Sequence, residues 1–405
     1  MTEQEEIYFE KLTERRTSLA ISLKDPAVSN FFDSSGEQKY SDKAHFIYEL
    51  LQNADDAGAT SVRFVLYKDK LVFAHNGTKR FSISNPSTEK EDSENNKLGD
   101  INAITSYGNS NKIAKIGKYG YGFKAVIDYT LTPYIYDPNI FFKIDEKIIP
   151  KKINGDFDGR EKNETLFVFL FDHPDRTADD AFANISKKLG SLDYPLLFLP
   201  NLKEISIQIP GLSYQYGKYV EQTMKFDDTD SEFIYLTQTD KNNPLDEKLW
   251  LFSRTVDDGY KYSVGFFLDK DGNLTAKEYP AFCFFSTTVS TGLKFIIHAP
   301  FLPTDNREGI RADSPHNKKM IALLAKLAAD SLVYLREIGK TNGKQLINDN
   351  IFNIIPYDKN KTEFSDINND KKISFLPFYT AIFEKMCNKE LLPSRDGYVA
   401  KKNAY

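Results

Sequence analysis

The sequence predicts an α+β protein with more than one domain: an α/β sandwich followed by a strand-rich α/β second domain. The length of 405 residues exceeds that of one average domain. Before about Gly211, segments with helical periodicity alternate with short runs typical of strands. After Gly211, strands separated by polar turns prevail until a helical pattern returns. We therefore expect four regions, at 1–40 (an N-terminal helix or strap), 41–210 (the sandwich), 211–340 (the second domain) and 341–405 (a C-terminal extension).

The first half should place helices on one face of a mixed sheet. Apolar residues in 42–57 keep a helical period, and two alternating runs after them predict a hairpin. Segment 82–100 is rich in Ser, Asn, Glu and Lys, which favours a mobile polar segment. The expected elements are helices at 3–20, 42–57 and 179–189, and strands at 62–67, 71–74, 133–136, 140–144, 165–171 and 204–209.

The second half alternates strands with polar turns and then returns to helix. A helix at 316–337 keeps its apolar residues at a 3.6-residue period. The polar stretch 357–372 predicts an exposed insertion. Two interpretations of 341–405 stay open: the start of a further region in a longer protein, or a tail that does not pack. The remaining elements are strands at 233–238, 249–255, 260–268, 281–285 and 295–298, a helix at 378–388 and a strand turn at 392–399.

The helix at 42–57 carries the most informative motif. Glu49, Asn53 and Asp56 are spaced four and three apart and therefore share one face. The opposite stripe is apolar, so the helix can pack while it presents the polar trio. Such a trio alone is more typical of a solvated helix face. Its meaning changes because of a second motif about sixty residues downstream.

That second motif is the glycine-rich turn 117–123, which leads into a predicted buried helix. Closely spaced glycines let the backbone approach a ligand, and the amides of a helix start suit a phosphate. Lysines surround the turn at Lys112, Lys115, Lys118 and Lys124. Attraction to nucleotide phosphates explains them more economically than binding to DNA.

Together these motifs resemble the GHKL superfamily of ATPases (gyrase, heat-shock chaperone, histidine kinase and MutL type), and within it the sacsin-like branch. The resemblance covers roughly residues 40–310 and is most specific at the two motifs above. It implies that 41–210 is a Bergerat-type sandwich that binds ATP with Mg²⁺, and that 211–340 is transducer-like. The matching segments are 49–60, 104–110 and 117–124, with weaker matches at 196–205 and 291–307.

The resemblance implies a role for each matching residue. Glu49 takes the place of the general base that activates water, and Asn53 that of a Mg²⁺ ligand, because its amide oxygen suits that ion. Asp56 takes a place that supports the nucleotide pocket. Thr165 matches a threonine that helps hold adenine, and Arg307 is either a γ-phosphate sensor or a surface arginine. The implied lid and phosphate-binding residues are Gly108, Asn109, Ser110, Gly117, Lys118, Tyr119, Gly120, Tyr121, Gly122, Phe123 and Lys124.

One departure from the family pattern falls in the implied adenine pocket. The family usually places an aspartate in an Asp-x-Gly turn, where it accepts a hydrogen bond from the adenine amino group. Here the turn is His75-Asn76-Gly77, and either His75 or Asn76 takes the aspartate position with a neutral acceptor. A neutral acceptor contributes about 1 kcal/mol, against about 1.5–3 kcal/mol for a charged one. We expect nucleotide binding to persist, with less secure selectivity for adenine over guanine. The alternative for His75 is that it is simply a residue of a hairpin turn.

Composition narrows the class of protein. The net charge of −5 disfavours a globally basic nucleic-acid binder, and no apolar run reaches the length of a membrane span. The acidic N-terminus lacks the features of a secretory signal. Cys283 and Cys387 are expected to be buried free thiols, and the histidines and cysteines show no zinc-like spacing. We therefore predict a cytoplasmic protein.

Three functions remain open from the sequence. The leading one is a slow Mg²⁺-dependent ATPase whose lid closure drives dimerisation or engagement of a partner domain in the same chain. The second is a nucleotide sensor that hydrolyses poorly. The third is a DNA-associated clamp of the MutL or MORC kind, which the acidic balance disfavours. The resemblance implies chaperone-like switching, and by family analogy a bacterial host-defence role.

Overall fold

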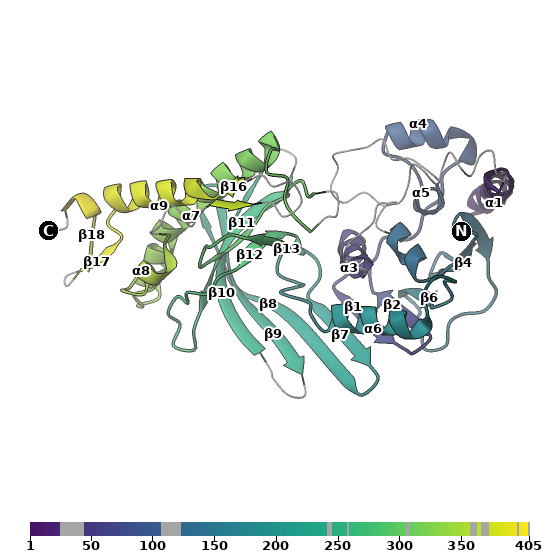
Figure 1. The fold of residues 1–405 in the computed structure, drawn as a ribbon, viewed down its shortest axis with the longest axis horizontal. Coiled ribbons are helices and arrows are strands. Elements are labelled where there is room, and N and C mark those ends of the chain that lie inside the picture. The colour runs from purple at the N-terminus through teal and green to yellow at the C-terminus, as the bar shows by residue number, and fades with distance from the viewer. Residues whose placement is uncertain are drawn as a thin grey trace. The chain divides into compact units, whose positions relative to one another are not determined.

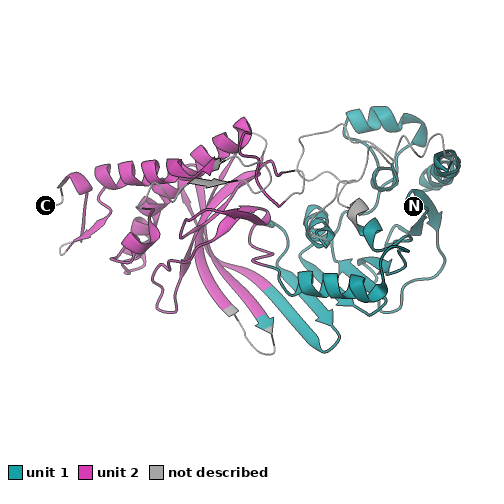
Figure 2. Ribbon diagram, viewed as in Figure 1, with its two compact units in different colours: residues 1–192, 199–216, 239–243 teal, residues 193–198, 217–238, 244–405 magenta. Residues whose placement is uncertain are grey.

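The computed structural model describes residues 1–24, 44–106, 123–240, 245–256, 259–304, 308–356, 363–365, 372–394 and 397–403. The chain divides into two compact units (Figure 2). Unit 1 comprises residues 1–192, 199–216 and 239–243, and unit 2 comprises residues 193–198, 217–238 and 244–405. The four regions with the boundaries given above stay a prediction.

Unit 1 is built on a mixed sheet with the strand order β7-β1-β2-β6-β3-β4-β5. Strands β1 and β7 run parallel, and the other neighbours pair antiparallel. The predicted α+β architecture is confirmed here, and Figure 1 shows the elements in place. The elements are α1 (Glu3–Leu23), α3 (Phe46–Asp56), β1 (Ser61–Leu66), β2 (Lys70–His75), α4 (Glu89–Glu94), α5 (Asp100–Ile104), β3 (Tyr134–Asp137), β4 (Ile140–Asp145), β5 (Ile149–Lys152), β6 (Thr165–Leu170), α6 (Ala178–Leu189) and β7 (Glu204–Ile209), with 3₁₀ turns at Pro86–Thr88 and Phe123–Asp128.

One face of this sheet carries the aromatic core that meets the helices. In β2 and β6, alternate residues point to that face, so Phe73 and Phe167 lie in register with ring centroids 5.8 Å apart. Helix α3 packs there through Phe46, whose ring lies 6.2 Å from that of Phe169. Helix α1 contributes Phe9 against Phe142 of β4. The helices and this face therefore enclose the core that positions the site.

Segment 82–100 contains regular structure that its composition did not predict. A 3₁₀ turn and α4 occupy its middle. The Glu89 carboxylate accepts hydrogen bonds from the buried Arg16 guanidinium of α1 at 2.6 and 3.2 Å, and from Asn102 at 3.0 Å. Asn102 also binds the backbone of Ser84 in both directions. These contacts from distant parts of the chain fix a segment whose local composition favours disorder.

Unit 2 combines a mainly antiparallel sheet with the long helix α7 and the helix α9. The strand order of its large sheet is β13-β12-β14-β11-β10-β9-β8; β12 and β14 pair in parallel, and β9–β10, β10–β11, β11–β14 and β12–β13 pair antiparallel. The elements are β8 (Leu212–Phe226, which begins in unit 1), β9 (Thr229–Asp240), β10 (Leu245–Thr255), β11 (Lys261–Leu268), β12 (Pro280–Cys283), β13 (Phe285–Ser290), β14 (Ile296–His298), α7 (Pro315–Thr341), α8 (Ile351–Ile354), β15 (Glu363–Ser365), β16 (Lys372–Ser374), α9 (Leu376–Asn388), β17 (Leu392–Ser394) and β18 (Gly397–Val399), with a final 3₁₀ turn at Lys401–Asn403.

The strands of unit 2 bury apolar residues on both faces. On one face, α7 and α9 cover a large core that includes Phe252, Phe266 and Phe375. On the other face, a smaller core forms around Leu249 and Phe267, and the segment 193–198 covers it. The described residues of 341–405 pack into the first core, so the interpretation of this region as an unpacked tail is wrong for them.

In unit 2, one strand prediction is wrong and one strand was not predicted. The run 281–285 is not one strand, because Phe284 adopts a positive φ of 63° and separates β12 from β13. Strand β8 was not predicted: most of its residues are exposed or half-buried, so it lacks a clear apolar alternation. Strand β8 forms because it hydrogen-bonds to its neighbours in the sheet, which its own sequence pattern does not predict.

Candidate functional site

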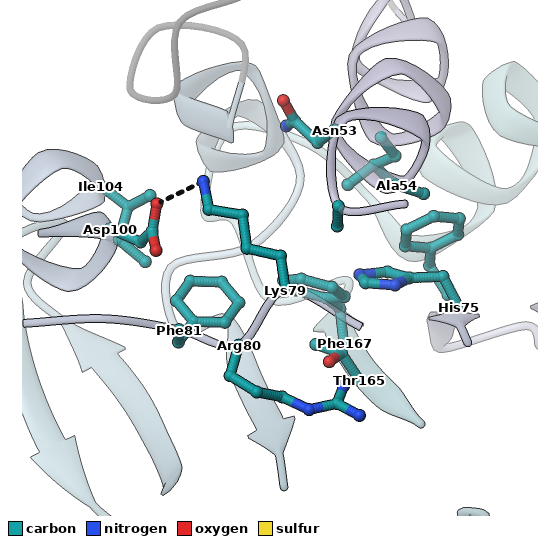
Figure 3. A pocket seen from close by; sticks show the side chains of 13 residues that line it. Asn53, Ala54, His75, Lys79, Arg80, Phe81, Asp100, Ile104, Thr165 and Phe167 are labelled. Atoms are coloured by element: carbon teal, nitrogen blue, oxygen red, sulfur yellow. Dashed lines mark hydrogen bonds and ion pairs between the residues drawn. The ribbon is translucent and has the colours of Figure 1, made fainter. Parts of the chain in front are cut away.

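A pocket lies between α3 and the sheet face formed by β2 and β6, entirely within unit 1 (Figure 3). Aromatic and aliphatic side chains form most of its wall, and a few polar groups converge on it. The residues that line it are Leu50, Asn53, Ala54, Ala57, Phe73, His75, Lys79, Arg80, Phe81, Asp100, Ile104, Thr165 and Phe167. The structure thus brings together three residues predicted from sequence: Asn53, His75 and Thr165.

Helix α3 supplies Asn53 to the pocket from the polar stripe predicted above. Glu49 lies one turn earlier on the same stripe and is half-buried, but it does not line this pocket. Asp56 is exposed and also lies outside the pocket lining. Burial raises the pKa of Asp56 to about 6, the neighbouring Asp55 and Glu49 carboxylates add to the rise, and Lys79 opposes it. Because Asp56 is exposed, solvent screening weakens this shift, and its direction is what enters the predictions below.

The residue beside it, Asp55, has a structural role that the sequence motif did not reveal. It is buried, and its Oδ1 accepts hydrogen bonds from the backbone N–H groups of Asn201 and Leu202, both at 2.8 Å. The Asn201 side chain donates back to the Asp55 carbonyl at 3.0 Å. The C-terminal end of α3 is therefore tied to the loop that follows the segment 193–198 of unit 2.

His75 ends β2 and forms part of the pocket wall. The imidazole is buried, and its Nδ1 accepts a hydrogen bond from the backbone N–H of Gly77 at 3.1 Å. Burial, with a smaller contribution from the Arg80 guanidinium, lowers the pKa of His75 to about 4. The ring is therefore neutral at pH 7. Since Nδ1 is the acceptor, the ring proton resides on Nε2.

Asn76 and Gly77 shape the turn and do not line the pocket. The Asn76 Oδ1 accepts from the backbone N–H groups of Thr60 at 2.9 Å and Ser61 at 3.0 Å, which holds the start of β1. A side chain at Gly77 would meet the Ala57 carbonyl at 2.9 Å, so glycine permits close packing against the end of α3. Of the two residues left open by the sequence, the structure places His75 in the pocket wall and Asn76 outside it.

Thr165 begins β6 directly opposite His75 in the antiparallel register, so the two side chains are neighbours on one face. Its hydroxyl donates to Asp137 Oδ2 at 2.7 Å. The Asp137 carboxylate is fully buried and also accepts the backbone N–H of Asn139 at 2.9 Å. Burial raises the pKa of Asp137, and the hydrogen bonds from Thr165 and Asn139 oppose that rise.

Two cationic residues and one carboxylate complete the polar part of the pocket, and the sequence motifs did not predict them. Lys79 Nζ lies 3.4 Å from Asp100 Oδ1 (Figure 3), and Asp100 Oδ2 accepts from the Ser82 backbone and hydroxyl at 3.1 and 2.7 Å. The Arg80 Nη1 donates to the Gly77 carbonyl at 2.7 Å. The adjacent basic pair Lys79-Arg80, immediately after the turn, is the signal that could have indicated them.

Several predicted site residues lie outside the described residues. They are Gly108, Asn109, Ser110, Gly117, Lys118, Tyr119, Gly120, Tyr121, Gly122 and Arg307, and the side chains of Phe123 and Lys124 belong with them. Their roles stay predictions.

The described part of the pocket is compatible with Mg²⁺ held mainly by a nucleotide. Within the described residues, no three His, Cys, Asp or Glu side chains group closely enough to hold a metal ion by themselves. Mg²⁺ commonly takes one or two protein oxygens and completes its shell with phosphate and water. The Asn53 side-chain amide, at the pocket wall, offers one such oxygen.

The two cysteines, Cys283 and Cys387, are free and half-buried. Among the helices that the structure describes, none has both the length and the apolar composition required to cross a bilayer.

Three comparisons with known proteins found matches, and the family match falls on the part of the chain that carries the pocket. Residues 38–165 match the family model described as the Sacsin domain. The Arabidopsis thaliana protein NO VEIN is 25% identical over 332 residues, covering 73% of this chain; the chain spans 11% of the length of that relative. Among solved structures, the topoisomerase IV ATP-binding domain of Francisella tularensis, in complex with a small-molecule inhibitor, is 15% identical, with 47% of this chain and 58% of that chain covered and a TM-score of 0.28. Residues 38–165 are therefore similar to the Sacsin domain, as the motifs predict.

Proposed function

We propose that unit 1 binds a nucleoside triphosphate with Mg²⁺ and hydrolyses it slowly, as the nucleotide-driven switch of a larger conformational cycle. The observation that carries this proposal is the pocket between α3 and the β2–β6 face, with Asn53 in its wall and Glu49 one turn earlier on the same helix. The match of residues 38–165 to the Sacsin domain supports the ATPase class.

In this proposal, the apolar wall holds the base and the polar groups orient the rest of the nucleotide. Phe73 and Phe167 offer flat apolar surfaces, and His75 with Thr165 offers polar atoms at one edge. Asn53 contributes an oxygen to Mg²⁺, which neutralises phosphate charge when bound. Glu49 accepts a proton from the attacking water.

The output of the switch is proposed to pass through the loop that Asp55 holds. Asn201 and Leu202 bind Asp55 at the end of α3, and Phe198, three residues earlier, belongs to the smaller core of unit 2. A shift of α3 on nucleotide binding therefore pulls on a short covalent connection to unit 2. The proposal extends to the partner and the role of the chain. We include in it engagement of a second copy or of a partner domain, a cytoplasmic location, chaperone-like action and a host-defence role.

Hydrolysis and binding are tested separately with two variants of α3. In Glu49→Ala, nucleotide affinity should stay within a few-fold of wild type while phosphate release is lost. In Asn53→Ala, affinity measured with Mg²⁺ should fall, and affinity measured with EDTA should change less. Wild-type binding without turnover would favour the non-hydrolysing sensor instead.

A further inference from the structure

A buried carboxylate lies behind the polar edge of the pocket. Asp137 is the last residue of β3, and the pairing of Tyr136 with Leu166 places it opposite Thr165 of β6. Thr165 lines the pocket, whereas Asp137 is fully buried and is not part of the lining. Asp137 can therefore act on a ligand only through the residues that it holds.

The hydrogen bonds of Asp137 decide the polarity of the Thr165 hydroxyl. Asp137 Oδ2 accepts from that hydroxyl at 2.7 Å, and Oδ1 accepts from the backbone N–H of Asn139 at 2.9 Å. Burial raises the pKa of Asp137, whereas these two hydrogen bonds, the Arg80 guanidinium and the Phe81 backbone N–H all lower it. A carboxylate that meets a donor on each oxygen acts as an acceptor. The Thr165 proton is therefore committed to Asp137, and the Thr165 oxygen is left to accept from the pocket side.

The turn after Asp137 also holds a second part of the pocket wall. The Asn139 side chain donates to the Phe81 carbonyl at 3.1 Å, and Phe81 lines the pocket. The Phe81 ring in turn lies 6.1 Å from that of Phe167, another wall residue. The acceptor oxygen of Thr165 and the aromatic wall beside it are thus fixed by the same turn, as a preorganised binding site requires.

We propose that Asp137 is a positioning residue, which fixes Thr165 as a hydrogen-bond acceptor for an N–H group on the base of a bound nucleotide. Adenine offers its 6-amino group and a 6-oxopurine offers N1–H, so the proposal concerns the contact and applies to either base. It rests on the proposed nucleotide site. In Asp137→Asn, the amide oxygen stays with the Asn139 N–H and the amide nitrogen donates to the Thr165 oxygen. Thr165 then turns its proton to the pocket and no longer accepts.

The test compares two ligands of the full chain in Mg²⁺ by calorimetry: ATP, and purine riboside triphosphate, in which a hydrogen replaces the 6-amino group. Wild type should bind ATP about fivefold more tightly, the effect of one hydrogen bond. In Asp137→Asn this ratio should fall to about one or lower, while the affinity for purine riboside triphosphate stays within about twofold of wild type. A merely structural role of Asp137 would weaken both ligands alike and leave the ratio unchanged.

Further variants isolate the contact. Thr165→Val removes the hydroxyl and should also bring the ratio to about one, which tests the same contact if Asp137→Asn does not fold. The double variant should give the ratio of Thr165→Val alone, because Asp137 acts through Thr165. Glu164→Gln is the matched control: Glu164 is a buried carboxylate next to Thr165, it binds Arg63 at 2.7 and 2.9 Å, and it lies outside the pocket lining. Its ratio should stay at about fivefold, and thermal unfolding checks that each variant is folded.

The outcomes separate this inference from the proposed function. If wild type binds neither triphosphate, the proposed function fails and the role of Asp137 with it. If wild type binds both equally tightly, the site stands and the contact to Thr165 is overturned. A fivefold ratio that persists in folded Asp137→Asn overturns the positioning role, and one that persists in Thr165→Val overturns the contact as well.

Discussion

Removal of two adjacent carboxylates at the end of α3 should have very different effects on stability. Asp55 is buried and accepts two backbone hydrogen bonds at 2.8 Å, whereas Asp56 is exposed. A hydrogen bond to a charged group contributes about 1.5 to 3 kcal/mol. Two such bonds at the low end of this range give about 3 kcal/mol. We therefore expect Asp55→Ala to lower the free energy of unfolding by about 3 kcal/mol.

Three further variants test this prediction in more detail. Asp55→Asn keeps an acceptor oxygen but loses its charge, so it should cost about 1 kcal/mol, between wild type and Asp55→Ala. Asp56→Ala should stay within about 0.5 kcal/mol of wild type at pH 7. The pKa of Asp56 is raised in the folded state, so the stability linked to its proton is present at low pH, where both states are protonated, and is lost as the pH rises through the raised folded-state pKa. Asp56→Asn should remove that part of the pH dependence.

Urea unfolding at 25 °C measures these differences, with circular dichroism reporting on the whole chain. The single tryptophan, Trp250, is buried in unit 2, so its fluorescence reports on that unit alone. If the units unfold separately, Asp55→Ala should move the dichroism transition more than the fluorescence transition. Equal effects of Asp55→Ala and Asp56→Ala, or no effect of either, would refute the reasoning about Asp55.

The remaining predictions concern unit 2. His298 is buried and stacked on Phe198 at 4.4 Å, and neither ring nitrogen has a hydrogen-bond partner among the described residues. Burial lowers its pKa to about 3. His298 therefore resists protonation in the folded state, so the free energy of unfolding should fall as the pH drops from 6.5 towards 3. In urea unfolding, His298→Phe should be at least as stable as wild type at pH 7 and should lose less stability in acid. The same loss of stability between pH 6.5 and pH 3 in His298→Phe as in wild type would contradict this. The Arg254 guanidinium binds Thr229, Asp330 and Tyr334 at 2.8 to 3.2 Å. Arg254→Met should cost about 3 kcal/mol, because within the part of the chain that the structure describes Asp330 would keep only its ion pair with Lys385. A cost under about 1 kcal/mol, read from Trp250 fluorescence, would show that the cluster contributes little.

Strong local signals allowed much of the fold to be predicted. The period of α3, the hairpin β1–β2 and the long helix α7 all follow from apolar spacing, and the structure agrees within a few residues. These elements are stabilised by contacts that their own pattern specifies. The motif helix also led directly to Asn53, which lines the pocket.

Features that depend on distant partners could not be predicted in this way. Helix α4 depends on Arg16, which is 73 residues from Glu89 in sequence. The role of Asp55 depends on amides 146 and 147 residues away, so a motif containing two adjacent aspartates could not indicate which of them is structural. The tautomer of His75 depends on the turn geometry at Gly77, and the sequence left both of its nitrogens available.

The central claim, that α3 and the β2–β6 face form a nucleotide-hydrolysing site, is tested most directly by one measurement on wild type and Glu49→Ala. Nucleotide affinity and phosphate release should be recorded together, with Mg²⁺ and with EDTA, using the nucleotide that binds most tightly. The proposal predicts that wild type releases phosphate only with Mg²⁺, and that Glu49→Ala binds nucleotide but releases none. Turnover that persists in Glu49→Ala would contradict the assignment of the base, and no binding by wild type would contradict the site itself.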